Sequence, residues 1–130
     1  MQFKKTLEIK ANHKQVVIKV ADILYIKASV NDCYIHVTSG SVYKTRSTLE
    51  AMEAQVGEYL LKVHRTYLVC IMAIHTLEDT LTLINGEELN YATRRRKEIL
   101  AQLQEKQRKL IATFALPNTP KTPEEYHAFY

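Results

Sequence analysis

Several residue types on which catalytic and metal-binding motifs depend are scarce in this sequence. Its 130 residues include three glycines, three prolines, two cysteines and no tryptophan. Three glycines leave little material for a glycine-rich phosphate loop, and no GxxxxGK, GxSxG or HExxH pattern occurs. Cys33 and Cys70 stand alone, without CxxC spacing or a histidine at ligand spacing, so we interpret them as small buried hydrophobic residues. The sequence therefore predicts no metal site, no disulfide and no cofactor.

The five histidines are scattered along the chain, which argues against catalysis because an active site needs convergent groups. A nucleophile paired with a base, either Cys33 with His36 or Cys70 with His64, is a minor alternative that only the fold can decide. We therefore predict that the chain is not an enzyme and has no small-molecule substrate.

Long hydrophobic runs are also missing. No apolar run approaches the roughly 18 residues that span a bilayer, and no signal peptide begins the chain, so we expect a cytoplasmic protein. The apolar helical pattern fades near residue 110, which suggests a domain over 1–110 and an extended tail over 111–130 that holds all three prolines. Aromatic residues near the end of the tail, Tyr126, Phe129 and Tyr130, leave open whether it frays, folds back or meets a partner.

Positive charge is concentrated in two parts of the chain. Residues 1–20 carry five lysines against one glutamate, and residues 94–109 carry seven cations against two acids. Residues 21–93 have the opposite balance, with nine acids against five cations. Concentrated cations of this kind predict a polyanionic partner, with nucleic acid ahead of an anionic membrane.

Short segments rich in β-branched residues predict a mainly β (α+β) fold. Apolar and polar residues alternate over 15–20 and 33–38, which is typical of half-buried strands. Similar apolar segments predict further strands at 23–28, 42–46, 59–64, 66–71, 80–84 and 87–91. Ser39-Gly40-Ser41 and Asn85-Gly86 mark turns between consecutive strands. We expect a meandering antiparallel sheet.

One short helix is predicted between the strands. Ser47-Thr48-Leu49-Glu50 has the pattern of a capping box, in which Ser47 caps the helix and Glu50 reaches back to it. Leu49, Met52 and Val56 then fall on one face, and Gly57 ends the helix.

A second helix is predicted to begin after Thr93 as its N-cap and to continue to about Ile111. Its first turn holds Arg94, Arg95 and Arg96, which is unusual because the helix dipole favours acids there. An anion that docks at this helix end would explain the placement. The alternative is a solvated face that meets acids elsewhere in the fold.

Polar residues gather at two connections between apolar strands, Ser29–Asp32 and His64–Thr66. Taken alone, each is a solvent-facing loop. Together with the arginine-rich segment, they are three projecting polar segments, which suits a protein that reads a DNA groove.

Five ordered segments resemble landmarks of the LytTR family of bacterial DNA-binding domains. They are ILYIKA (23–28), YIHVT (34–38), RSTLE (46–50), LKVHRTYLV (61–69) and YATRRR (91–96). The resemblance covers roughly residues 5–105. Two positions depart from it: Cys70 stands where asparagine is frequent, and the turn at 30–33 lacks a frequent glycine, which puts the base preference of that loop in doubt.

The resemblance implies an elongated scaffold of antiparallel strands with one short capped helix and a C-terminal helix. Such a scaffold inserts loops, rather than a recognition helix, into successive major grooves. By position, the implied DNA-contacting residues are Asn31, Asp32, Arg46, His64, Arg65, Arg94, Arg95 and Arg96. Arg46 is a phosphate candidate, whereas Asp32 is expected to order its loop. His64 either contacts DNA or fixes its own loop, and which arginine reads a base is open, with Arg95 the first to test.

The resemblance further implies transcriptional regulation by a homodimer on repeated half-sites of double-stranded DNA. Family members commonly follow a receiver domain, and because too few residues precede the fold here, the chain resembles the stand-alone kind. Its control would then come from expression level, a regulatory protein partner or the tail. The alternative from another class is a protein-interaction module whose basic regions bind an acidic protein or an anionic membrane surface.

Overall fold

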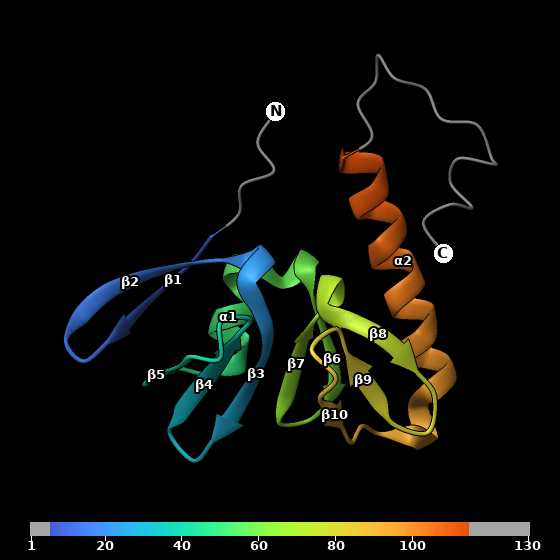
Figure 1. The fold of residues 1–130 in the computed structure, drawn as a ribbon, viewed down its shortest axis with the longest axis horizontal. Helices are drawn as coiled ribbons and strands as arrows, with labels where there is room; N and C mark the ends of the chain where they lie inside the picture. The colour runs from blue at the N-terminus through green and yellow to red at the C-terminus, as the bar shows by residue number, and fades with distance from the viewer. Residues whose placement is uncertain (1–5, 115–130) are drawn as a thin grey trace.

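The computed structural model describes residues 6–114, which form three antiparallel sheets and two α-helices (Figure 1). The strands are β1 (Thr6–Ala11), β2 (Lys14–Lys19), β3 (Ile23–Ser29), β4 (Asp32–Val37), β5 (Val42–Thr45), β6 (Leu60–His64), β7 (Tyr67–Cys70), β8 (Ile74–Leu77), β9 (Leu81–Leu83) and β10 (Glu88–Leu89). The helices are α1 (Leu49–Val56) and α2 (Arg96–Phe114). The predicted mainly β class with a short helix and a C-terminal helix is confirmed.

Strands β1 and β2 form a separate hairpin that projects on the side of the molecule away from α2 (Figure 1). Strand β1 was absent from the prediction, although Leu7, Ile9 and Ala11 alternate as its buried residues. The two turn residues, Asn12 and His13, have φ angles of 54° and 66°. Two positive φ angles match a type I′ hairpin turn, which usually contains glycine and is therefore hard to recognise in this sequence.

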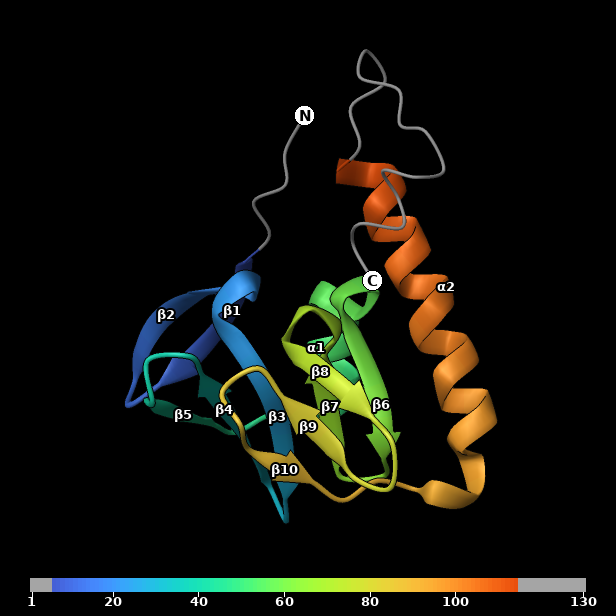
Figure 2. The same ribbon diagram turned by 45° about the vertical axis from the view of Figure 1, so that its right-hand side comes forward.

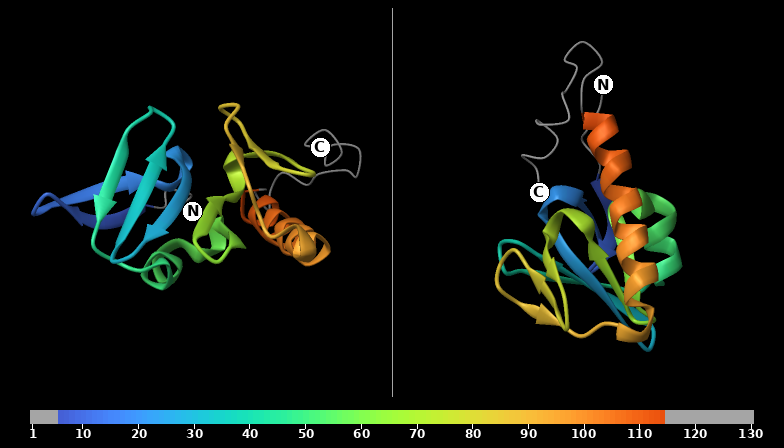
Figure 3. Two further views of the ribbon diagram at one scale, coloured as in Figure 1. Left: turned by 90° about the horizontal axis from the view of Figure 1, so that it is seen from below. Right: turned by 90° about the vertical axis from the view of Figure 1, so that its right-hand side faces the viewer.

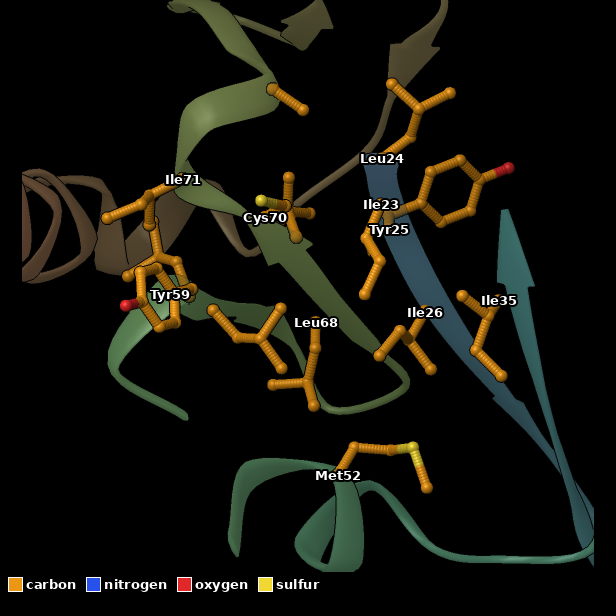
Figure 4. Close-up of a cluster of buried hydrophobic side chains, with 14 of the residues drawn as sticks. Ile23, Leu24, Tyr25, Ile26, Ile35, Met52, Tyr59, Leu68, Cys70 and Ile71 are labelled. Carbon is orange, nitrogen blue, oxygen red and sulfur yellow. The ribbon is translucent and has the colours of Figure 1, made fainter. Parts of the chain in front are cut away.

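The central sheet has five strands in the order β5-β4-β3-β7-β6. The predicted meander is therefore wrong at one point, because the chain leaves β5 at one edge, passes through α1 and enters β6 at the opposite edge. Apolar residues of α1 cover this sheet, and Met52 points toward Ile26 and Leu68 in the core (Figure 4). Ile26 and Leu68, on β3 and β7, have no exposed surface.

The third sheet, in the order β10-β9-β8, packs beside the central one. Its Asn85-Gly86 turn pairs β9 with β10 as predicted, whereas β8 was not predicted. The hydroxyl of Tyr25 on β3 donates to Glu87 at 2.8 Å and joins the two sheets. Helix α2 runs along β6 (Figure 2), where Lys106 Nζ donates to the carbonyl oxygens of Gly57 and Leu60.

Both predicted helix starts need correction, by one residue for α1 and by two for α2. The N-cap of α1 is Thr48, whose hydroxyl accepts from the Ala51 amide at 3.1 Å, and not Ser47. Thr93 is not an N-cap either, because it opens a single 3₁₀ turn that ends at Arg95. The α-helix proper begins at Arg96, so Arg94 and Arg95 precede it.

Helix α2 continues past the predicted end near Ile111 to Phe114. The predicted tail from 115 onward, including Tyr126, Phe129 and Tyr130, lies outside the described residues. Within 6–114, no helix is long and apolar enough to cross a membrane.

Candidate nucleic-acid interface

Three polar segments lie at one end of the molecule: the β3–β4 turn, the β6–β7 turn and the start of α2. They form the lower edge in Figure 1 and face the viewer in the left view of Figure 3. Backbone hydrogen bonds tie them together. The Ala28 amide donates to the Thr66 carbonyl at 2.8 Å, and the Ala92 amide donates to the Val63 carbonyl at 2.9 Å. The sheet order thus brings together three segments that are far apart in sequence.

The β3–β4 turn consists of Val30 and Asn31, because Ser29 pairs with Asp32 across the hairpin. Val30 is 95% exposed and Asn31 is also exposed, so both project from the end of the sheet. Neither has a positive φ, so the glycine missing from this turn is not required by its backbone conformation. Asp32 is half-buried, and its Oδ2 lies 3.9 Å from Lys44 Nζ on β5. This contact agrees with a role for Asp32 in ordering the loop.

The β6–β7 turn presents Arg65 as an exposed side chain between two residues that bind each other. His64 Nδ1 accepts from the Thr66 amide at 3.3 Å and lies 3.0 Å from the Thr66 hydroxyl. The His64 ring also packs edge-on against Tyr67, with ring centroids 5.6 Å apart. These contacts support the interpretation in which the half-buried His64 fixes the loop that carries Arg65.

Aromatic rings contact one another on one face of the central sheet, with Tyr67 next to the β6–β7 turn. Tyr25 stacks on His36, with ring centroids 4.2 Å apart, and meets Tyr67 edge-on. Lys27 Nζ lies 5.7 Å from the centre of the Tyr67 ring. Burial lowers the pKa of His36 and raises that of Tyr25, which the hydrogen bond to Glu87 raises further. Both rings therefore favour the neutral state and act as packing surface, while Lys27 supplies charge near the turns.

The three arginines at the start of α2 are in different environments. Arg95 donates from Nε and Nη2 to the two carboxylate oxygens of Glu98, at 2.9 and 3.1 Å. Arg96 Nη1 lies 3.8 Å from Asp79. Arg94 is exposed and has no hydrogen bond or ion pair with any other described residue. The acids predicted by the solvated-face alternative are thus present for two of the three arginines, whereas Arg94 has no acidic partner among the described residues.

Arg46 lies at the same end of the central sheet but outside the three segments. It follows Thr45, which pairs with Cys33 at the beginning of β4, so Arg46 is placed beside Asp32. Sequence reasoning did not single out its cationic neighbours Lys10 and Lys44, which share a groove with it. The alternation of Leu7, Ile9 and Ala11 was the signal that could have revealed the hairpin that carries Lys10.

The two cysteine–histidine alternatives receive no support from the geometry. Cys33 Sγ donates to the Ser47 carbonyl at 3.3 Å, and Cys70 Sγ lies 3.7 Å from the Val20 carbonyl oxygen. Burial raises the pKa of Cys33 and raises that of Cys70 to about 11, which disfavours the thiolate a nucleophile needs. Among residues 6–114, no group of three or more histidine, cysteine or acidic residues could hold a metal ion.

Comparison with known proteins places this geometry in a family. Residues 13–104 match the sequence profile of the LytTr DNA-binding domain. A solved structure, the LytTr DNA-binding domain of a methyl-accepting/DNA response regulator from Bacillus cereus, is similar with a TM-score of 0.65 at 15% identity. That match covers 77% of this chain and 97% of the Bacillus chain, and it concerns the fold. No curated protein sequence matches. Because the profile spans most of its length, the chain belongs to the LytTR family of DNA-binding domains.

Proposed function

We propose that the chain binds double-stranded DNA in a sequence-specific manner by inserting its turns into the major groove. The observation that carries this proposal is the convergence of the β3–β4 turn, the β6–β7 turn and the start of α2 at one end of the fold, joined by backbone hydrogen bonds. Exposed amide and guanidinium groups on rigid turns suit the hydrogen-bonding pattern of base edges in that groove.

Each candidate side chain has a role that follows from its surroundings. Arg94 and Arg65 are exposed guanidinium groups, which pair best with guanine O6 and N7. Asn31 offers an amide that can pair with adenine. Arg95 and Arg96 keep acidic neighbours and serve as phosphate contacts, as does Arg46. Asp32 and His64 order their turns.

We further propose that this binding regulates transcription in the cytoplasm, with a homodimer on repeated half-sites and a regulatory protein as a further partner. The DNA-binding unit, predicted over 1–110, is assigned through Phe114 because α2 ends there, and it contains the entire matched segment; the predicted tail of 111–130 is shortened to 115–130. Concentrated cations over 1–20 and 94–109 support a polyanionic partner.

Selection from a random pool of double-stranded DNA tests the proposal. Wild-type protein should enrich one motif, and the Arg94→Ala variant should lose preference at one position of that motif while other positions stay unchanged. Binding of selected and scrambled duplexes with equal affinity would contradict sequence-specific recognition. Vesicles with anionic headgroups test the alternative, since a membrane-binding module would bind them with no preference among DNA sequences.

A further inference from the structure

A second cationic feature lies outside the three turns, between the β1–β2 hairpin and the edge of the central sheet formed by β4 and β5. It is an open hollow of about 440 Å³, which we call the hairpin groove. Its lining residues are Lys10, Asn12, His13, Asp32, Lys44, Thr45 and Arg46. All seven side chains are polar or charged, and all except the buried Thr45 are at least partly accessible.

We propose that the hairpin groove binds a phosphate of the DNA backbone, just beyond the base pairs that the β3–β4 turn contacts. This inference rests on the proposed DNA-binding function and adds a fourth contact, made by the β1–β2 hairpin. The hairpin thereby takes part in binding and does more than cover the core.

The charge of the groove fits a phosphate. Lys10, Lys44 and Arg46 bring three cations against one acid, Asp32. Asp32 lies 3.9 Å from Lys44 Nζ, so its charge is already partly offset. Cations on two facing hairpins can approach one phosphate from both sides, which is how proteins hold the DNA backbone.

The groove is rigid before any ligand arrives. The Thr45 hydroxyl donates to the Lys10 carbonyl at 2.9 Å and joins the two walls. Behind this contact, Gln55 on α1 exchanges two hydrogen bonds with the backbone of Glu8, both at 2.9 Å. The hairpin is thus fastened to the sheet and to α1. A preformed wall loses little conformational entropy on binding, so its contacts add directly to affinity.

The position of the groove is continuous with the proposed interface. Asp32, one of its lining residues, follows directly after Asn31 of the β3–β4 turn. Along the long axis of Figure 1, the hairpin lies at the end opposite to α2, with the β3–β4 and β6–β7 turns between them. A duplex that runs along this row of turns therefore reaches the hairpin groove as its backbone leaves the β3–β4 turn. Because the groove lies in the same row as the proposed DNA-contacting turns, we assign it to a phosphate of the duplex and not to a free anion.

Binding measurements on two variants of the groove and one control test the proposal. Lys10→Gln and Lys44→Gln each remove one charge from the groove. Lys19→Gln removes the same charge at the base of the same hairpin, where Lys19 pairs with Thr6. Each groove variant should lose roughly fivefold to tenfold in affinity near 0.1 M salt, equally on selected and random duplexes, and its salt slope should fall by about 0.9. Lys19→Gln should bind like wild type.

A shortened duplex supplies the second readout. Removal of the flanking base pairs next to the β3–β4 site should lower wild-type affinity at least as much as Lys10→Gln does, and should affect Lys10→Gln less than wild type, because that variant has already lost one of the groove's contacts. If Lys10→Gln and Lys19→Gln bind alike and wild type tolerates the shorter duplex, the groove proposal is overturned. Wild type would still show sequence preference in that case, so the proposed function would stand. Loss of all sequence preference in wild type would instead overturn both.

Discussion

Arg95 and Glu98 form a two-point ion pair one helical turn apart, with nitrogen–oxygen distances of 2.9 and 3.1 Å. The pair engages the Nε and Nη2 edge of the guanidinium group, which is an edge that reads guanine. Arg94, one residue earlier, is exposed and makes no side-chain hydrogen bond or ion pair within residues 6–114. The arginine run is therefore divided into a restrained member and an available one, although the residues are identical in type.

The different environments of Arg94 and Arg95 predict that their alanine variants lose DNA affinity in different ways. Arg94→Ala should lower affinity for the selected site by roughly fivefold to 150-fold, with a much smaller loss on random DNA, because a bidentate contact to guanine disappears. Arg95→Ala should lower affinity on both duplexes by a similar and smaller factor, as expected for a phosphate contact. Gel-shift titrations of both variants on both duplexes measure this. Base-specific loss in Arg95→Ala alone would reverse the assignment.

Removal of the Glu98 carboxylate provides an independent test of the same pair. Glu98→Gln should bind DNA several-fold more tightly and with a salt slope steeper by about one, because an acid is lost and Arg95 is released toward phosphate. The helix should keep its stability, since exposed ion pairs contribute little. Glu105→Gln serves as the matched control, because Glu105 pairs with Arg108 farther along α2. Weaker binding of Glu98→Gln would show that the ion pair orients Arg95 for a base contact.

The His64–Thr66 contact predicts coupling between these two residues. If His64 acts by holding the turn, His64→Ala and Thr66→Ala should each weaken DNA binding, and the double variant should be little worse than the poorer single one. If His64 contacts DNA independently, the two losses should add. Dissociation constants for the four proteins complete this cycle. His64→Asn should restore part of the affinity, because an asparagine oxygen can accept from the Thr66 amide.

Much of this interface followed from local patterns in the sequence, but its assembly did not. The turns at Asn31 and Arg65 and the arginine run were all recognisable, because each interrupts an apolar segment. Their proximity depends on the placement of β7 beside β3, with Lys27 opposite Tyr67. That pairing requires the crossing from β5 to β6 through α1, which is a long-range arrangement without a local signature.

The missed features have similar causes. Strand β1 alternates correctly, but its lysine-rich residues and a turn without glycine concealed the hairpin at Asn12 and His13. The 3₁₀ turn at Thr93–Arg95 shifted the start of α2, because Thr93 satisfies the preferences of an N-cap without acting as one. The hairpin groove could not be predicted from local sequence patterns. Its two walls come from segments more than 30 residues apart, which are joined by the hydrogen bond from Thr45 to Lys10.

Because Cys33 and Cys70 are buried, we expect their thiols to resist chemical modification in the folded protein. Burial raises the pKa of Cys70 to about 11 and also raises that of Cys33, so at mildly alkaline pH both remain protonated in the folded state. A disulfide reagent such as dithionitrobenzoate should therefore react with neither thiol in native protein and with both in concentrated guanidinium chloride. Rapid reaction of one thiol without denaturant would indicate local opening of its strand.

Two apolar residues only four positions apart on the β3–β4 hairpin should respond very differently to truncation. Ile26 has no exposed surface and lies between α1 and the strands β4 and β7, whereas Val30 is 95% exposed at the turn. Ile26→Ala should reduce the free energy of unfolding by about 2–5 kcal/mol, because it removes buried methyl groups and leaves a cavity. Val30→Ala should stay within about 0.5 kcal/mol of wild type. Urea denaturation followed by circular dichroism gives both values. A large loss in Val30→Ala would mean that the turn is covered in solution, and the proposed DNA-facing end would then be an interface between protein chains.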